Sequence, residues 1–240
     1  VLLASCKKDN VENPANMEKN LIKSTYVWDG GTPEINEFTY DAQGRISVQK
    51  GSTRTYTFNY VSATSLIVTE RKTSDNSLHQ TQECTLNDKG YITKMVFKNP
   101  AGVITYNYNY VYNADGYITR LEGFSTPGNG YEVDYTIVNG NAVSSINYNN
   151  GVLNYTGEYT YDNSKLNKTA SGHSGYWQSP LLFGKRTKNL LSEYKSKGPA
   201  GATTWHTQYA YEMDAAGYPV KLTTTNVLNG KQGVDTYIYK

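Results

Sequence analysis

The chain has 240 residues, of which 18% are charged, and its formal net charge is +2. This length suits one all-β domain or two smaller ones, and so small a net charge provides no strong field for nucleic acid or an anionic membrane surface. The 23 tyrosines suit half-exposed strands, because each combines an apolar ring with a polar tip.

The N-terminus carries a motif for lipid attachment. Leu3-Ala4-Ser5-Cys6 matches the lipobox of bacterial lipoprotein signal peptides, in which small residues precede a cysteine that receives a diacylglycerol. We therefore expect residues 1–5 to be a signal-peptide remnant and Cys6 to be the lipidated residue, the alternative being an ordinary apolar start. The polar residues that follow have the composition of a flexible tether, predicted over residues 6–25.

One phrase recurs along the rest of the chain. Phe38–Ile46 returns as Cys84–Ile92, Tyr110–Ile118 and Tyr211–Pro219, and weaker copies indicate a unit of about 25 residues. Each copy contains an Asp/Asn-x-x-Gly turn, in which the Asx side chain bonds its own backbone and the glycine supplies a positive φ. A second turn, variable and rich in Gly, Asn and Pro, lies between copies. Two turns per unit predict two antiparallel strands, with the two kinds of turn at opposite ends of the sheet.

The side-chain pattern within the units has a period of two. Tyr106, Tyr108, Tyr110 and Tyr112 share one face of a strand, while Asn107, Asn109, Val111 and Asn113 share the other. This period is typical of strands and excludes a helical repeat.

The repeat therefore predicts a single all-β domain over residues 26–240. We expect a long antiparallel meander of β-hairpins that forms a strongly twisted or curved open sheet. Residues 172–197 interrupt the period, and Ser179-Pro180 followed by Gly184 carries helix start and stop signals. We expect there a short helical or apolar insertion that replaces one hairpin and covers the apolar face of the sheet.

No motif predicts catalysis, a cofactor or a metal site. His79, His173 and His206 lack metal-ligand spacing, and the Asx turns lack the acidic ligands of a calcium loop. Cys84 occupies a position that other copies fill with an aromatic residue, so we expect a buried thiol. A glycoside hydrolase using two strand carboxylates as acid and base is the alternative, because such residues pair in space. The strand glutamates, expected on the solvated face, are Glu37, Glu83, Glu132, Glu158 and Glu212.

Four aromatic residues outside the repeated phrase are the candidate ligand-binding residues: Trp28, Tyr176, Trp177 and Trp205. Flat rings of this kind stack on sugar faces or anchor protein interfaces. The alternative interpretation is that they close the ends of the sheet as part of its core.

The repeated phrase resembles the YD repeats of the RHS type, with Phe38–Ile46 as the closest copy. Together with the lipobox, the phrase at 211–220 and Asn189-Leu190 before it, the chain resembles Bacteroidetes-type lipoproteins that carry a degenerate β-repeat domain of unknown function. The resemblance implies a β meander and offers no catalytic residues.

The combined expectation is a non-enzymatic binding or scaffold protein of the cell envelope. It would be lipid-anchored through Cys6 to the outer membrane, on the periplasmic or the exterior side, and would contact a glycan or protein through exposed aromatics and loops. No nucleic-acid partner is expected.

Overall fold

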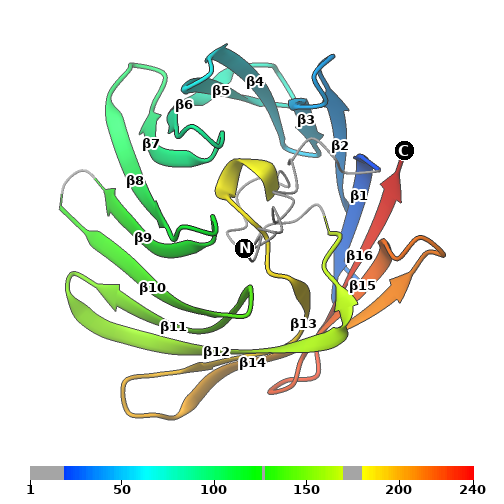
Figure 1. The fold of residues 1–240 in the computed structure, drawn as a ribbon. Coiled ribbons are helices and arrows are strands. Elements are labelled where there is room, and N and C mark those ends of the chain that lie inside the picture. The colour runs from blue at the N-terminus through cyan, green and yellow to red at the C-terminus, as the bar shows by residue number, and fades with distance from the viewer. Residues whose placement is uncertain (1–18, 126–127, 170–179) are drawn as a thin grey trace, which may run out of the picture.

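The computed structural model describes residues 19–125, 128–169 and 180–240. Sixteen antiparallel strands, each paired with the next in sequence, form one sheet that closes into a barrel (Figure 1). The strands are β1 (Leu21–Trp28), β2 (Glu34–Tyr40), β3 (Ile46–Gly51), β4 (Arg54–Ser62), β5 (Ser65–Lys72), β6 (Leu78–Leu86), β7 (Ile92–Lys98), β8 (Ile104–Tyr112), β9 (Ile118–Ser125), β10 (Gly130–Val138), β11 (Asn141–Asn149), β12 (Val152–Leu166), β13 (Asn189–Lys197), β14 (Thr203–Met213), β15 (Pro219–Asn226) and β16 (Gln232–Tyr239). One short 3₁₀ helix, η1 (Pro180–Phe183), lies between β12 and β13.

The predicted open sheet is wrong, because β1 pairs with β16 along its length. The pairing runs from Leu21 opposite Tyr239 to Trp28 opposite Gly233. Beyond it, the backbones of Asn20 and Lys240 exchange hydrogen bonds of 2.8 and 2.9 Å. The sheet curves until its two edges meet, and this closure satisfies the backbone groups that both edges would otherwise leave unpaired. Strand β1 begins at Leu21, within the range predicted as tether.

The insertion also differs from its prediction. Strand β12 continues to Leu166, and β13 occupies Asn189–Lys197, inside the range 172–197 predicted as the insertion. The inserted residues therefore lie between these two strands. β12 and β13 remain paired with each other, from Thr156 opposite Lys197 to Leu166 opposite Asn189. The inserted residues therefore replace an Asx turn and not a hairpin, and their one regular element among the described residues is the four-residue η1.

The Asx turns form as the sequence predicts. In the turn after β8, Asn113 Oδ1 accepts a hydrogen bond of 3.0 Å from the Tyr117 N–H, and Gly116 has a φ of 93°. The tyrosine that precedes several of these turns has a repeated role of its own. The hydroxyls of Tyr40, Tyr112 and Tyr161 donate to the backbone carbonyls of Leu21, Ile92 and Ala142, at 2.6–2.8 Å. In these three copies the aromatic-Asx phrase thus ties its strand to an earlier one.

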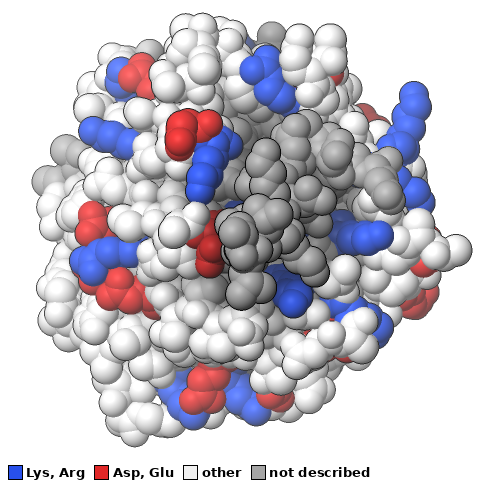
Figure 2. Space-filling model, in the orientation of Figure 1, with Lys and Arg blue, Asp and Glu red and all other residues white. Residues whose placement is uncertain are grey.

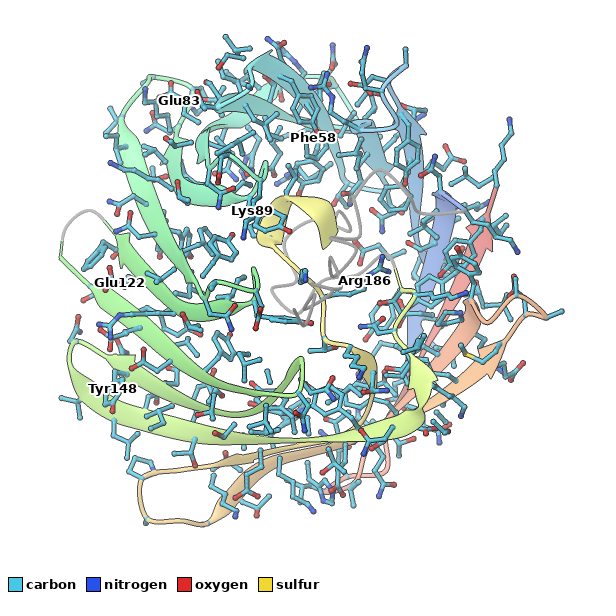
Figure 3. All side chains as sticks on the ribbon, viewed as in Figure 1. Phe58, Glu83, Lys89, Glu122, Tyr148 and Arg186 are labelled. Carbon is cyan, nitrogen blue, oxygen red and sulfur yellow. The ribbon has the colours of Figure 1, made fainter. Side chains whose placement is uncertain are left out.

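The lumen face of the barrel is identified by η1. Phe183 of η1 packs on Tyr110 with ring centroids 5.3 Å apart, so the tyrosine face of β8 points inward, and Val111 on the other face is 47% exposed. Figure 3 shows Phe58 inside the ring of strands and Glu83, Glu122 and Tyr148 toward its outside. The buried apolar cluster is formed by inward residues of β1–β8 and β16 together with Leu182 and Phe183, and includes the predicted buried thiol of Cys84.

The two kinds of turn lie at opposite ends of the barrel, as predicted. In Figure 1 the Asx turns after β6 and β8 converge around η1, whereas the variable turns after β7 and β13 lie at the periphery. Backbone bonds fasten the insertion to the first end: Lys185 N–H donates to Gly116 O and Lys188 N–H to Gly140 O, both at 2.8 Å. We call this the plugged end and the opposite one the wide end.

Candidate functional site

Inward-facing aromatic rings at the wide end are exposed to solvent. Tyr106 is 48% exposed, Trp205 45% and Tyr131 36%, and all three lie next to variable turns. The buried inward residue Tyr110 lies deeper, toward the plugged end. The lumen is therefore accessible from the wide end and apolar at its floor, which makes its wall the candidate site.

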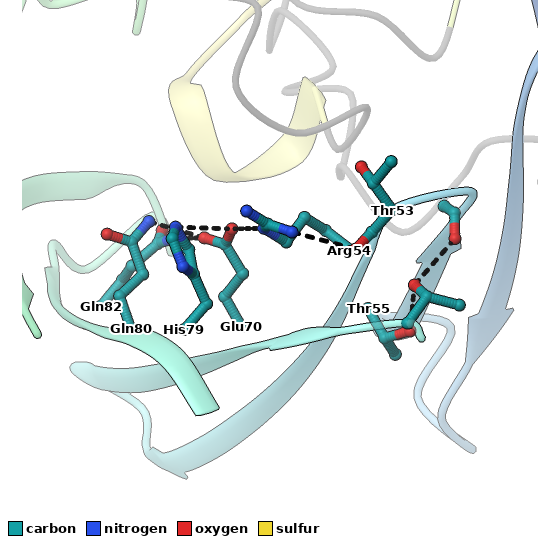
Figure 4. A network of polar contacts seen from close by, with 9 residues as sticks. Thr53, Arg54, Thr55, Glu70, His79, Gln80 and Gln82 are labelled. Carbon is teal, nitrogen blue, oxygen red and sulfur yellow. Dashed lines mark hydrogen bonds and ion pairs between the residues drawn. The ribbon is translucent and has the colours of Figure 1, made fainter. Parts of the chain in front are cut away.

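A carboxylate network lines one side of this wall. Glu70 of β5, only 5% exposed, accepts hydrogen bonds from Gln80 Nε2 at 2.6 Å and Arg54 Nε at 3.1 Å, and a longer one from Gln82 Nε2 at 3.4 Å. His79 Nε2 lies 3.8 Å away, and Figure 4 shows the four side chains converging on the carboxylate. This buried charge is compensated by its neighbours, so we interpret it as a structural part of the wall.

Buried amide oxygens on the lumen side have no hydrogen-bond partner in the described part of the chain. They belong to Gln49, Gln82 and Asn147, which are 6%, 2% and 0% exposed. The amide nitrogens are used: Gln49 Nε2 donates to Asn36 Oδ1 at 3.2 Å, and Asn147 Nδ2 donates to the hydroxyls of two tyrosines. A buried acceptor without a partner is costly, and these oxygens have almost no accessible surface, so a ligand in the lumen does not reach them in this conformation.

Tyrosines line the opposite side of the lumen. Asn147 bridges the hydroxyls of Tyr131 and Tyr155 at 2.8 and 3.0 Å, and Ser145 Oγ lies 3.0 Å from the Tyr159 hydroxyl. Burial raises the pKa of Tyr159 to about 12 and also raises the pKa of Tyr155. These phenols therefore remain neutral at physiological pH and can both donate and accept hydrogen bonds.

Inward glycines let aromatic rings lie flat against the wall. A Cβ at Gly123 would stand 2.6 Å from Tyr108, and one at Gly233 would stand 2.7 Å from Trp28. Tyr106 continues the first of these surfaces, because its ring stacks beside Tyr108 with an interplanar angle of 8°. Rings held in this way present flat faces, the geometry that suits stacking on a sugar ring.

The outer wall is different, because four of the five strand glutamates predicted on it are ion-paired. Glu83, Glu158 and Glu212 each lie 2.6 Å from a lysine Nζ, and Arg120 lies 2.6 Å from Glu132 and 2.9 Å from Glu122. In Figure 2 blue and red side chains are interspersed on the visible face. The glutamates considered as an acid–base pair thus lie outside the lumen, where His206 also pairs with Glu193 at 2.7 Å.

The four predicted ligand-binding residues do not form one group in the structure. Trp28 of β1 and Trp205 of β14 both face the lumen, on different parts of its wall. Tyr176 and Trp177, like Cys6, lie outside the described residues.

Sequence reasoning missed the polar lumen residues, above all Glu70, Gln82 and Asn147. Their signal is a polar side chain at the inward position of a period-two pattern, as in Ser145-Ile146-Asn147. That signal can be read only once the inward face is known.

Two further observations concern the described residues only. Among them, no helix has the length and hydropathy needed to cross a membrane. No cluster of three or more His, Cys, Asp or Glu side chains with metal-binding geometry occurs in these ranges either.

Comparison with known proteins identifies the type of fold. Residues 38–221 match a family model described as a domain of unknown function (DUF4595) with porin-like fold. A porin-like protein from Bacteroides uniformis superposes with a TM-score of 0.69 at 15% identity, covering 92% of this chain and 96% of that one. A porin-like protein from Bacteroides vulgatus gives a TM-score of 0.60 at 14% identity, covering 92% and 98%. No curated protein matches this chain.

Proposed function

Because the chain belongs to the DUF4595 family of domains of unknown function with a porin-like fold, we propose a function from the chemistry of its own lumen. The barrel is a non-enzymatic binding protein that takes a hydroxyl-rich ligand, a glycan, through the wide end. The observation that carries this proposal is the set of exposed inward rings at the wide end, Tyr106, Tyr131 and Trp205, beside tyrosine hydroxyls that Asn147 holds in place. Glycan recognition uses these two elements, a stacking face and fixed hydrogen-bond groups.

The proposed location is the cell envelope, with the lipid on Cys6 holding the barrel beside the membrane. The lipobox supports the anchor, and the ion-paired outer wall supports a barrel surrounded by water. Arg120, for example, lies within β9 and pairs with carboxylates of β9 and β10. A membrane-spanning barrel instead presents an apolar band to lipid, where an outward arginine costs about 2–4 kcal/mol at mid-depth.

The alternative, a glycoside hydrolase that uses two strand glutamates, has less support, since four of the five glutamates considered for it are ion-paired on the outer wall. Shortening of an oligosaccharide incubated with the purified protein, detected by mass spectrometry, would favour the hydrolase over the binding protein.

The binding test uses a panel of neutral oligosaccharides and isothermal titration calorimetry. We expect Trp205→Ala and Tyr106→Ala each to weaken binding about five- to tenfold, because a stacked ring contributes about 1–1.5 kcal/mol. Tyr148→Ala is the matched control, since Tyr148 lies on the outer wall (Figure 3), and we expect its affinity to equal that of the wild type. Equal losses in all three variants, or no binding to any member of the panel, would contradict a lumen site.

The anchor is tested separately in cells that process bacterial lipoproteins. We expect Cys6→Ala to abolish incorporation of labelled fatty acid and to release the protein from the membrane fraction. Labelling that persists in this variant would contradict lipidation at Cys6.

A further inference from the structure

Two carboxylates face the lumen where the first and last parts of the chain close the barrel. Tyr26 of β1 is paired on one side with Asp235 of β16 and on the other with Glu34 of β2. Residues paired across adjacent strands share a face of the sheet, so all three point the same way, and the outer two backbones lie about 10 Å apart across Tyr26. Gly233, next along this face of β16, is covered by the rings of Tyr26 and Trp28.

These carboxylates lack the partners that the outer ones have. In the parts of the chain that the structure describes, Asp235 and Glu34 make neither an ion pair nor a side-chain hydrogen bond. By contrast, Glu83, Glu158 and Glu212 on the outer wall each pair with a lysine. Four of the five outward strand glutamates thus have a cationic partner, Glu37 being the exception, whereas neither Asp235 nor Glu34 has one in the described ranges.

The surroundings of Asp235 make the absence of a cationic partner costly. Burial, and then the negative charge of Glu34, raise the pKa of Asp235 to about 6. The titratable groups that face it are Glu34 from β2, Tyr26 from β1, Tyr211 from β14 and Tyr237 on its own strand, while the residue paired with it on β15 is Leu222. None of these is a cation, so a cation from a ligand would remove the penalty.

From this geometry we propose that the lumen ligand carries an ammonium group, which binds between Asp235 and Glu34. The rings of Tyr26 and Trp28 border the same place and offer faces for a cation–π contact. With the exposed rings and tyrosine hydroxyls of the proposed glycan site, the ligand class is a glycan that contains amino sugars. This inference rests on the proposed function, because it assumes that the lumen is the ligand site.

The test compares three probes by isothermal titration calorimetry at pH 7.0: a glucosamine tetramer, its fully N-acetylated counterpart and spermidine. We expect the glucosamine tetramer to bind at least tenfold more tightly than the acetylated one. Equal binding of the two tetramers would overturn the ammonium site while leaving glycan binding intact. Binding of spermidine alone would support the ammonium site and contradict glycan binding. Binding of none of the three would overturn this proposal.

Variants locate the site. We expect Asp235→Asn combined with Glu34→Gln to reduce the preference for the charged tetramer to less than twofold. Glu37→Gln is the matched control, because Glu37 is an exposed carboxylate of the same strand as Glu34 and lies on its opposite face, and it should keep the preference. Circular dichroism confirms that each variant is folded. A preference that survives in the double variant, or that disappears in Glu37→Gln, would overturn the proposal.

A pH series gives a second measurement that does not depend on substitution. Spermidine keeps its charge between pH 5.0 and 7.5, whereas Asp235 becomes protonated as the pH falls through about 6. If spermidine binds, we expect about tenfold weaker binding to the wild type at pH 5.0 and a smaller change in Asp235→Asn. The same pH dependence in both proteins would overturn the role of Asp235.

Discussion

Asp235→Asn should stabilise the folded barrel at neutral pH. The pKa of Asp235 rises from an ordinary 3.8 to about 6, and a tenfold change in proton affinity corresponds to about 1.36 kcal/mol. The upper bound is therefore about 3 kcal/mol, and we expect about 1.5 kcal/mol because the carboxyl group is partly exposed and screened. Urea unfolding followed by fluorescence measures this as a higher free energy of unfolding for the variant at pH 7.5.

The pH dependence of this difference identifies its cause. Between about pH 4 and pH 6 the folded state holds a proton on Asp235 that the unfolded state has lost. The wild type is therefore stabilised as the pH falls through this window, and Asp235→Asn is not. We expect the advantage of the variant to shrink from pH 7.5 to nearly zero at pH 4.5.

The control for this series is Glu37→Gln, which removes an exposed outward carboxylate of β2 and should show no such trend. An Asp235→Asn protein that is less stable than the wild type at every pH would refute the reasoning. That result would mean that the carboxylate has structural partners that its asparagine substitute cannot keep.

Three other substitutions and measurements test the fold. Phe183→Ala removes a ring that is 5% exposed and should cost up to about 3–5 kcal/mol, with faster hydrogen exchange at the insertion if η1 detaches. Gly123→Ala places a Cβ 2.6 Å from the Tyr108 ring and should cost about 1–3 kcal/mol in urea unfolding. Gly130→Ala, whose nearest contact would be 3.8 Å away, should cost less. Cys84, whose thiol pKa burial raises to about 12, should react with a thiol reagent only after unfolding; prompt labelling of the folded protein would contradict its burial.

The sequence predicted the local structure of this barrel well, because strands and Asx turns depend on nearby residues. The alternation of Tyr106–Tyr112 placed these four rings on one face of β8, and Asn113 and Gly116 specified the turn that follows. Closure could not be predicted in this way. It depends on pairing Leu21 with Tyr239, and no local pattern distinguishes an edge strand that meets another edge from one that stays open.

The candidate site was less predictable, for a related reason. When both faces of a strand carry polar residues, the sequence does not say which face encloses the lumen. Asn147 and Asp235 have the same residue types as many outward positions, and only the closed barrel shows that one is fully buried and the other is near a second carboxylate. Of the predicted aromatic residues, Trp28 and Trp205 are inward, but tryptophan identity alone did not point to the polar groups around them.

The contrast between the two walls connects the fold to its proposed function. The outer wall pairs most of its charges, among exposed apolar side chains such as Val111, Phe124 and Ile238. The lumen holds amide oxygens without donors and carboxylates without cations in the described ranges, both of which cost stability in the empty protein. A ligand that supplies an ammonium donor to the carboxylates removes part of these costs in the folded state alone, so its binding should also raise the melting temperature.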